Sequence, residues 1–199
     1  MDPLKYFLKI KSCFFMIMVT VAYFFFPIVG IYLFAHGSWF TQLLLTILLI
    51  YQYFICKTSS IFRRFISWGS PANFFNAHDL IFDDYNDFQY FKSVGKPKAK
   101  TLLCYHPHGV MGYGVTILTY QYDYFESFVR LGSRMAINIP WGGLLLKLGG
   151  IQGVNPENLG LLMKNEQNIL MVPGGFEEAT LSNFKEDRVF LKKRKGFIK

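Results

Sequence analysis

The chain has 199 residues, which is enough for a membrane anchor and one domain of about 100 to 150 residues. Hydrophobic residues make up 52% of it and its mean hydropathy is +0.24, which is high for a soluble protein, while the formal net charge is +8. The three cysteines are widely spaced and form no C-x-x-C pair, so we expect no disulfide framework and a reducing, cytosolic environment.

Two uncharged apolar segments follow one another near the N-terminus, at residues 14–34 and 39–56. Each matches the length of a helix in the ~30 Å hydrocarbon core of a bilayer. Basic residues flank the pair, whereas the short loop between the two segments has none: they are Lys5, Lys9, Lys11, Lys57, Arg63 and Arg64. The positive-inside rule therefore predicts a transmembrane or re-entrant helical hairpin with both flanks in the cytosol, kinked at Pro27. A cleaved signal peptide is the alternative, but no convincing cleavage site separates the segments.

The sequence of residues 61–100 predicts secondary structure less clearly. Residues 61–91 are rich in aromatic side chains without a clear periodicity, and they fit either the membrane surface or the underside of a domain. Residues 95–100 read as a basic linker. We therefore divide the chain into a membrane hairpin (1–60), a connecting segment (61–100) and a domain (101–199).

An alternating strand and helix pattern begins at residue 101. Asn155 and Pro156 form a good helix start, with Asn as the N-cap and Pro at the first helical position. Strands are predicted at 101–105, 134–139, 151–154 and 168–172, and helices at 110–120, 141–148 and after Asn155. This order predicts an α/β fold with a mostly parallel sheet flanked by helices, whose functional residues gather beyond the carboxyl ends of the strands.

Two histidines follow the first predicted strand, in the sequence His106-Pro107-His108-Gly109. A histidine near its reference pKa of ~6.5 can accept a proton at neutral pH, as a general base must. Pro107 restricts the backbone, and Gly109 lets the chain turn or approach a ligand closely. The tetrapeptide is compatible with catalysis, with a two-histidine metal site, or with structural histidines. A zinc site would need His78 or Glu178 as a third ligand, and no familiar ligand spacing is present, so we expect no metal.

A glycine and glutamate segment follows the last predicted strand: Gly174, Gly175, Phe176, Glu177 and Glu178. Its glycines allow close backbone approach, and a carboxylate near a histidine can orient the imidazole. An ordinary turn with solvated glutamates is the alternative. No serine-hydrolase elbow, phosphate-binding loop or dinucleotide fingerprint occurs in the chain.

Four sequence blocks, in order, resemble one enzyme family. YHPHGVMG at residues 105–112 is similar to the YHPHG block of the diacylglycerol acyltransferase type 2 family, which includes monoacylglycerol acyltransferases and wax synthases. The resemblance continues through Gly149-Gly150-Ile151, the GG-x-x-E pattern that ends at Glu178, and RKGF at residues 194–197. The fold expected from it is that of a glycerolipid acyltransferase. Family members continue beyond the last block, so we expect the domain to be incomplete at its C-terminus.

The resemblance implies a direct acyl transfer without a covalent acyl-enzyme. His108 is the preferred general base with His106 as a supporting base, Glu178 holds the imidazole, and backbone N–H groups near Gly109 and Gly112 stabilise the oxyanion. Pro107, Gly174, Gly175 and Glu177 form the supporting loops. Arg194 and Lys195, in a basic C-terminal run that could otherwise be solvated, are expected to bind the phosphates of acyl-CoA.

The expected substrates are acyl-CoA, as a co-substrate without any further cofactor, and diacylglycerol or a related neutral lipid. The membrane is the expected partner, with a possible homo-oligomer and no nucleic acid. The resemblance places the chain in the endoplasmic reticulum membrane, with both termini and the active site facing the cytosol. Three alternatives stay open: a monoacylglycerol or fatty-alcohol acyltransferase, a metal-dependent membrane hydrolase, and an inactive fragment that acts only through interactions.

Overall fold

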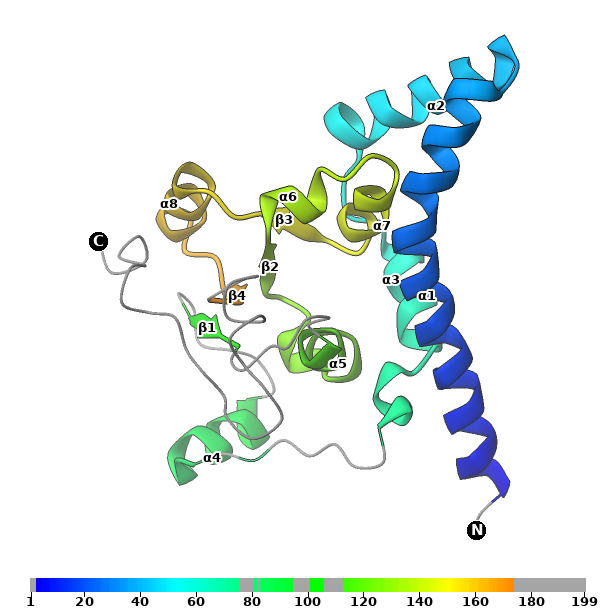
Figure 1. Ribbon diagram of the computed structural model, residues 1–199. Helices are drawn as coiled ribbons and strands as arrows, with labels where there is room; N and C mark the ends of the chain where they lie inside the picture. Colours follow the sequence, from blue (N-terminus) through cyan, green and yellow to red (C-terminus); the bar gives the residue numbers. More distant parts are fainter. Residues whose placement is uncertain (1–2, 76–80, 82, 95–100, 106–112, 174–199) are drawn as a thin grey trace, which may run out of the picture. The chain divides into compact units, whose positions relative to one another are not determined.

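The computed structural model describes residues 3–75, 81, 83–94, 101–105 and 113–173. The chain forms two compact units, each built from two stretches of sequence (Figure 1). Unit 1 contains residues 1–80 and 134–152, and unit 2 contains residues 81–133 and 153–199. The predicted division into hairpin, connecting segment and domain stays a prediction.

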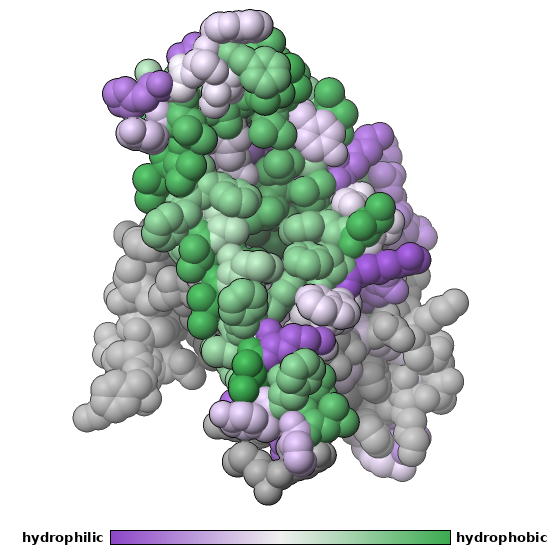
Figure 2. All heavy atoms as spheres, turned by 90° about the vertical axis from the view of Figure 1, so that its right-hand side faces the viewer, coloured by the Kyte–Doolittle hydropathy of each residue, from purple (hydrophilic) through white to green (hydrophobic). Residues whose placement is uncertain are grey.

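Unit 1 is helical and begins with the predicted hairpin. Helix α1 (Pro3–His36) runs without interruption through Pro27, and α2 (Trp39–Ile50) continues into a π-helical turn, η1 (Tyr51–Ile55). Ser38 caps α2, because its Oγ accepts a hydrogen bond from the Thr41 N–H at 3.3 Å. Among the described residues, α1 is the one helix that by itself is long and apolar enough to cross a membrane. Apolar side chains cover the outer face of the hairpin (Figure 2).

The aromatic segment after the hairpin is also helical, although its sequence shows no clear periodicity. Helix α3 (Ser60–Trp68) is followed by the 3₁₀ turn η2 (Pro71–Phe74), and this pair is bent by 100° from the run Trp39–Ile55. The start of α1 holds η2 in place, since the Ser12 hydroxyl donates to the Ser70 carbonyl oxygen at 2.9 Å. Phe15 lies against Gly69, where no larger residue would fit.

The second stretch of unit 1 lies on the hairpin. It contains α6 (Arg134–Ile137), α7 (Gly142–Leu148) and most of strand β3 (Ile151–Gly153). The predicted strand at 134–139 is therefore wrong. The carbonyl groups of this segment are bonded by hairpin side chains rather than by a neighbouring strand. Gln52 Nε2 donates to the Ile139 oxygen at 2.9 Å, and the Tyr53 hydroxyl donates to the Asn138 oxygen at 2.6 Å.

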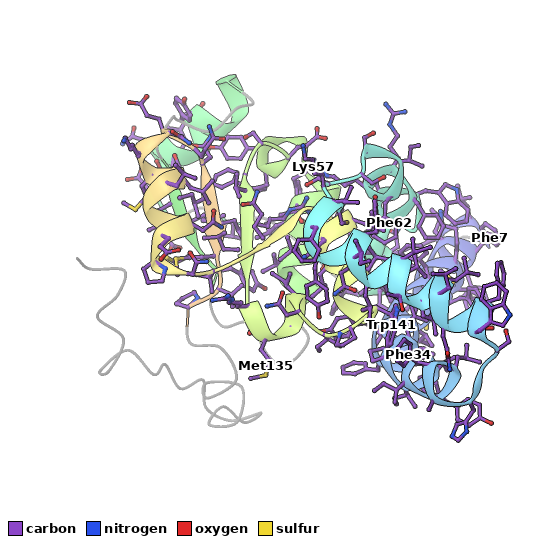
Figure 3. The ribbon with its side chains drawn as sticks, turned by 90° about the horizontal axis from the view of Figure 1, so that it is seen from above. Phe7, Phe34, Lys57, Phe62, Met135 and Trp141 are labelled. Atoms are coloured by element: carbon purple, nitrogen blue, oxygen red, sulfur yellow. The ribbon has the colours of Figure 1, made fainter. Side chains whose placement is uncertain are left out.

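Trp141 packs directly against the hairpin (Figure 3). Its ring lies directly against Gly30, where a Cβ atom would overlap it, and its Nε1 donates to the Leu45 carbonyl oxygen at 3.2 Å. Its backbone has a φ of 57°, which a non-glycine residue rarely adopts and which costs on the order of 1–3 kcal/mol. Packing against both hairpin helices holds the residue in this conformation.

Unit 2 contains the parallel part of the sheet. Strand β4 (Ile169–Met171) lies between β1 (Leu102–Cys104) and β2 (Val129–Gly132) and is parallel to both, within the sheet order β1-β4-β2-β3. The predicted strands at 101–105, 151–154 and 168–172 are confirmed, as is the parallel sheet. Strand β2 was not predicted from the sequence, because Arg130 interrupts its apolar run. The glycerolipid acyltransferase-like fold stays a prediction.

Helices cover the strands of unit 2 on two faces (Figure 1). One face packs on α8 (Pro156–Lys164), which begins as predicted with Asn155 as its N-cap: the Asn155 Oδ1 accepts from the Asn158 N–H at 2.6 Å. The buried apolar cluster there contains Leu131, Leu162, Ile169 and Met171. The opposite face carries Arg130, which contacts α5 (Tyr113–Gln121). Unit 2 also contains α4 (Tyr85–Val94) and the 3₁₀ turn η3 (Asp123–Phe125).

Candidate active site

The carboxyl ends of β1 and β4 meet at one edge of the sheet. Cys104 stands opposite Met171 in the parallel register, and the Tyr105 N–H donates to the Met171 carbonyl oxygen at 2.9 Å. At the other end of the pair, the Thr101 N–H donates to Asn168 Oδ1 at 3.0 Å. The two strands that precede the predicted catalytic segments are therefore direct neighbours, and both end at the same place, as expected for a site at the carboxyl edge of a parallel sheet.

The predicted catalytic and binding residues lie outside the described residues. In sequence, the HPHG segment follows Tyr105 directly and the glycine and glutamate segment follows Pro173 directly. The residues concerned are His106, Pro107, His108, Gly109, Gly112, Gly174, Gly175, Glu177, Glu178, Arg194 and Lys195. Their roles stay predictions.

Tyr105 connects the strand end to the start of α5. Its hydroxyl occupies the space where a Cβ atom of Gly114 would stand. Tyr105 and Gly114 lie on either side of residues 106–112, so this contact brings together the described residues that flank the HPHG segment. Burial raises the pKa of the Tyr105 phenol, which is therefore neutral at physiological pH. No local pattern relates Tyr105 to Gly114, so the sequence alone does not predict this contact.

We expect Gly114→Ala to disturb this arrangement. The added methyl group would overlap the Tyr105 ring, so the ring or the first turn of α5 has to move, at a cost of about 1–3 kcal/mol. The expected acyl transfer should fall along with the thermal stability of the detergent-solubilised protein. Gly160→Ala in α8 is the matched control, because a Cβ atom there meets nothing within 4 Å and the helix should become slightly more stable. Equal stability and activity in the two variants would contradict the proposed importance of the Tyr105 contact.

Arg130 fixes the position of α5 on the sheet. This buried guanidinium donates to the Thr119 hydroxyl at 3.3 Å and lies 4.8 Å from the centre of the Tyr120 ring. The Thr119 hydroxyl in turn donates to the Val115 carbonyl oxygen at 2.8 Å. A buried, hydrogen-bonded arginine holds its neighbours in a defined geometry. Arg130 therefore positions the helix that follows the HPHG segment, a role that the sequence did not reveal.

Two other chemistries receive no support from the described residues near this edge. Cys104, the last residue of β1, has an exposed side chain, and its partial burial raises the pKa of the thiol and so lowers the fraction of reactive thiolate at neutral pH. Over the parts of the chain that the structure describes, no group of three His, Cys, Asp or Glu side chains could hold a metal ion. The predicted histidines lie outside these parts, so the prediction of a metal-free site stays untested.

Comparison with known protein families decides the class of this protein. The sequence pattern of the diacylglycerol acyltransferase family matches residues 31–199. The chain belongs to this family. The match begins within α1 and extends over all four sequence blocks noted above, so both units of this diacylglycerol acyltransferase family member contribute to it. No curated protein and no solved structure matches the chain.

Membership of the diacylglycerol acyltransferase family identifies the chain as an acyltransferase of lipid metabolism. Together with α1, whose length and composition suit a membrane span, it indicates a membrane protein. For a diacylglycerol acyltransferase family member, the carboxyl edge of β1 and β4 is the candidate active site.

Proposed function

We propose that this chain transfers a fatty acyl group from acyl-CoA to the hydroxyl group of diacylglycerol, which makes triacylglycerol, at the surface of the endoplasmic reticulum membrane. One observation carries the proposal: the strands that precede the HPHG and GG-x-x-E blocks are parallel neighbours whose carboxyl ends meet. His108 comes three residues after Tyr105, and Glu178 comes five residues after Pro173. At no more than about 3.6 Å per residue, both side chains are within reach of the same edge.

The reaction requires a base, a means of holding that base, and donors for the oxyanion. His108 accepts the proton of the acceptor hydroxyl while the hydroxyl oxygen attacks the thioester carbonyl carbon. Backbone N–H groups near Gly109 and Gly112 stabilise the negative charge that develops on the carbonyl oxygen. The carbon–sulfur bond then breaks, and the coenzyme A thiolate leaves with the proton from the imidazolium. Glu178 orients the imidazole and stabilises its protonated form.

The reaction needs no metal in this scheme. His106 supports His108 as the alternative base, and Pro107, Gly174, Gly175 and Glu177 shape the two loops. The neutral Cys104 thiol at the end of β1 favours direct transfer over a cysteine acyl-enzyme. Arg194 and Lys195 bind the phosphate groups of acyl-CoA. The hairpin keeps the site next to the bilayer, where diacylglycerol is dissolved.

An acyl-transfer assay tests the proposal and names the acceptor. Membranes containing the full chain receive labelled oleoyl-CoA together with diacylglycerol, monoacylglycerol, a fatty alcohol or lysophosphatidate. Labelled triacylglycerol, formed faster than the products of the other acceptors, is the expected result. A preference for another acceptor would reassign the substrate within the acyltransferase class. Release of free fatty acid that stops on addition of a chelator, or the absence of any product from folded protein, would overturn the proposal.

The role of the basic C-terminal pair can be tested separately. Arg194→Glu combined with Lys195→Glu should raise the KM for acyl-CoA by roughly a hundredfold or more, because it removes two charge-assisted contacts worth roughly 1.5–3 kcal/mol each. The KM for the acceptor lipid should not change, because the acceptor carries no phosphate. The neighbouring double variant Lys192→Glu with Lys193→Glu is the matched control, since it alters the charge of the same run equally. The same increase in both variants would contradict a specific phosphate contact at Arg194 and Lys195.

A further inference from the structure

Helix α3 has one face that packs inside unit 1. Ser59 caps it, with its Oγ accepting a hydrogen bond from the Phe62 N–H at 3.2 Å. Ile66 is buried, and Phe65 makes an edge-to-face contact with Phe15 of α1 at a centroid distance of 5.1 Å. These contacts fix the rotation of α3 about its own axis, so the direction of its other faces is determined within unit 1.

Beside that face, α3 carries an apolar ridge that the described residues of unit 1 cover only in part, through Phe15 on Phe65 and Lys11 on Trp68. Ile61 is 79% exposed, Phe65 is 40% exposed and Trp68 is 61% exposed. Their spacing of four and three residues places the three side chains in one row along the helix. Single exposed apolar residues are common on protein surfaces, but a contiguous row of them is typical of a surface that binds another protein or a membrane.

The direction of α3 shows what covers the ridge. The run from α2 through η1 is apolar and uncharged, and the helices α3 and η2 that follow it are bent away by 100°. If α2 runs along the bilayer normal, a helix at nearly a right angle to it lies close to the membrane plane. An amphipathic helix in that plane places its apolar side chains among the headgroups and the upper acyl chains.

The charge of unit 1 favours an anionic bilayer surface. The described residues of unit 1, 3–75 and 134–152, contain no aspartate or glutamate, so all of their charged side chains are basic; Asp2 and Asp79 are the two acidic residues in the rest of unit 1. The basic residues are Lys5, Lys9, Lys11, Lys57, Arg63, Arg64, Arg134 and Lys147. Lys57 and Arg64 are exposed, and both are close in sequence to the residues of the ridge. Lys11 lies beside its end, where its ammonium group donates to the Trp68 carbonyl oxygen at 2.6 Å and lies 4.6 Å from the centre of the Trp68 ring.

We propose that α3 is an interfacial helix that binds anionic phospholipids. Its ridge of Ile61, Phe65 and Trp68 enters the headgroup region, while Lys57 and Arg64 contact the phosphate groups of the surrounding lipids. The combination of an indole ring with a basic side chain at the same point is typical of membrane–water interfaces. This role sets the depth of the hairpin and is independent of acyl transfer.

The depth of Trp68 tests the position of the ridge. The full chain is reconstituted in phosphatidylcholine vesicles whose acyl chains carry bromine either near the headgroup or near the methyl end. The emission of Trp68 is obtained by subtracting the emission of the Trp68→Phe variant from that of the wild type. This subtraction cancels the contributions of Trp39 and Trp141, which both proteins contain. We expect stronger quenching by bromine near the headgroup. Equal emission in brominated and ordinary lipid would mean that protein covers the ridge, and stronger quenching near the methyl end would place it in the hydrocarbon core. Either result would overturn the proposal.

Lipid selectivity tests the basic residues. Spin-labelled phosphatidylserine and phosphatidylcholine are compared for their association with the reconstituted full chain, and the wild type should prefer phosphatidylserine. Lys57→Gln and Arg64→Gln should each lower this preference by roughly two- to fivefold, the effect of one basic side chain near an anionic surface. Lys164→Gln, at an exposed position of α8 in unit 2, should not change it. The same preference in all four proteins would contradict phospholipid binding by α3. Because these measurements do not use catalysis, they are unaffected by a failure of the proposed function.

Discussion

Replacing His108 with alanine should lower the rate of acyl transfer by roughly 10²–10⁴-fold, the contribution of a general base. The methyl side chain cannot accept the hydroxyl proton, so the neutral acceptor would have to attack the thioester without being deprotonated. The KM for acyl-CoA should change little, since the phosphate contacts are assigned to Arg194 and Lys195. The measurement is the formation of labelled triacylglycerol by membranes that contain equal amounts of the variant and the wild type.

His36→Ala is the matched control for this experiment. His36 is the last residue of α1, and its ring lies 5.0 Å from that of Tyr32. It belongs to unit 1, whereas the strands of the candidate active site belong to unit 2. Its removal should leave the rate of transfer unchanged. His106→Ala separates the two histidines of the HPHG segment: a smaller loss than in His108→Ala fits a supporting role. Activity retained in His108→Ala but lost in His106→Ala would exchange their roles, and activity retained in both would contradict histidine catalysis.

Replacing Trp141 with alanine should lower the free energy of unfolding of unit 1 substantially. Trp141 is 8% exposed, its ring fills the space over Gly30, and its Nε1 bonds the Leu45 carbonyl oxygen. Alanine would lose this packing and the hydrogen bond while keeping the unfavourable backbone conformation. We expect a loss of about 3 kcal/mol, the lower end of the range for a buried tryptophan, because detergent can replace part of the lost apolar contact.

Thermal unfolding of the detergent-solubilised full chain measures this effect. Trp39→Ala is the matched control, because Trp39 begins α2 with 76% of its surface exposed and should contribute little. Gly30→Leu tests the same contact from the hairpin side, since its side chain would occupy the space of the Trp141 ring. Equal melting temperatures for Trp141→Ala and Trp39→Ala would show that the 134–152 segment does not depend on the hairpin for its stability.

The association of residues 134–152 with the hairpin also bears on how the membrane region contributes to the enzyme. This segment connects β2 with β3, and it receives hydrogen bonds from Tyr23, Gln52 and Tyr53 of the hairpin. Lys147 adds a bond to the Gln52 carbonyl oxygen at 2.5 Å. The hairpin is therefore part of a folded unit that includes sequence from the middle of the chain, and its role goes beyond that of an anchor.

Local sequence signals determined much of this protein. The hairpin follows from two uncharged segments of suitable length, and the start of α8 follows from Asn155 and Pro156. Strands β1, β3 and β4 follow from short apolar runs next to glycine, proline or polar turn residues. The order of the four sequence blocks already indicated the acyltransferase family, which the match over residues 31–199 established. Each of these signals acts between residues that are close together in the chain, so the sequence alone is sufficient to recognise it.

Only the tertiary structure decided which distant segments meet. Residues 134–139 form a helix and turn rather than a strand, because hairpin side chains about 85 residues away bond their carbonyl groups. Strand β4 lies between β1 and β2, which brings the strand ends before the two predicted catalytic blocks to one edge. Tyr105 meets Gly114, and Arg130 holds α5, through contacts whose geometry no local pattern encodes. Local propensities fix the elements, whereas the pairing of strands and the partners of buried polar groups depend on packing between residues far apart in the chain.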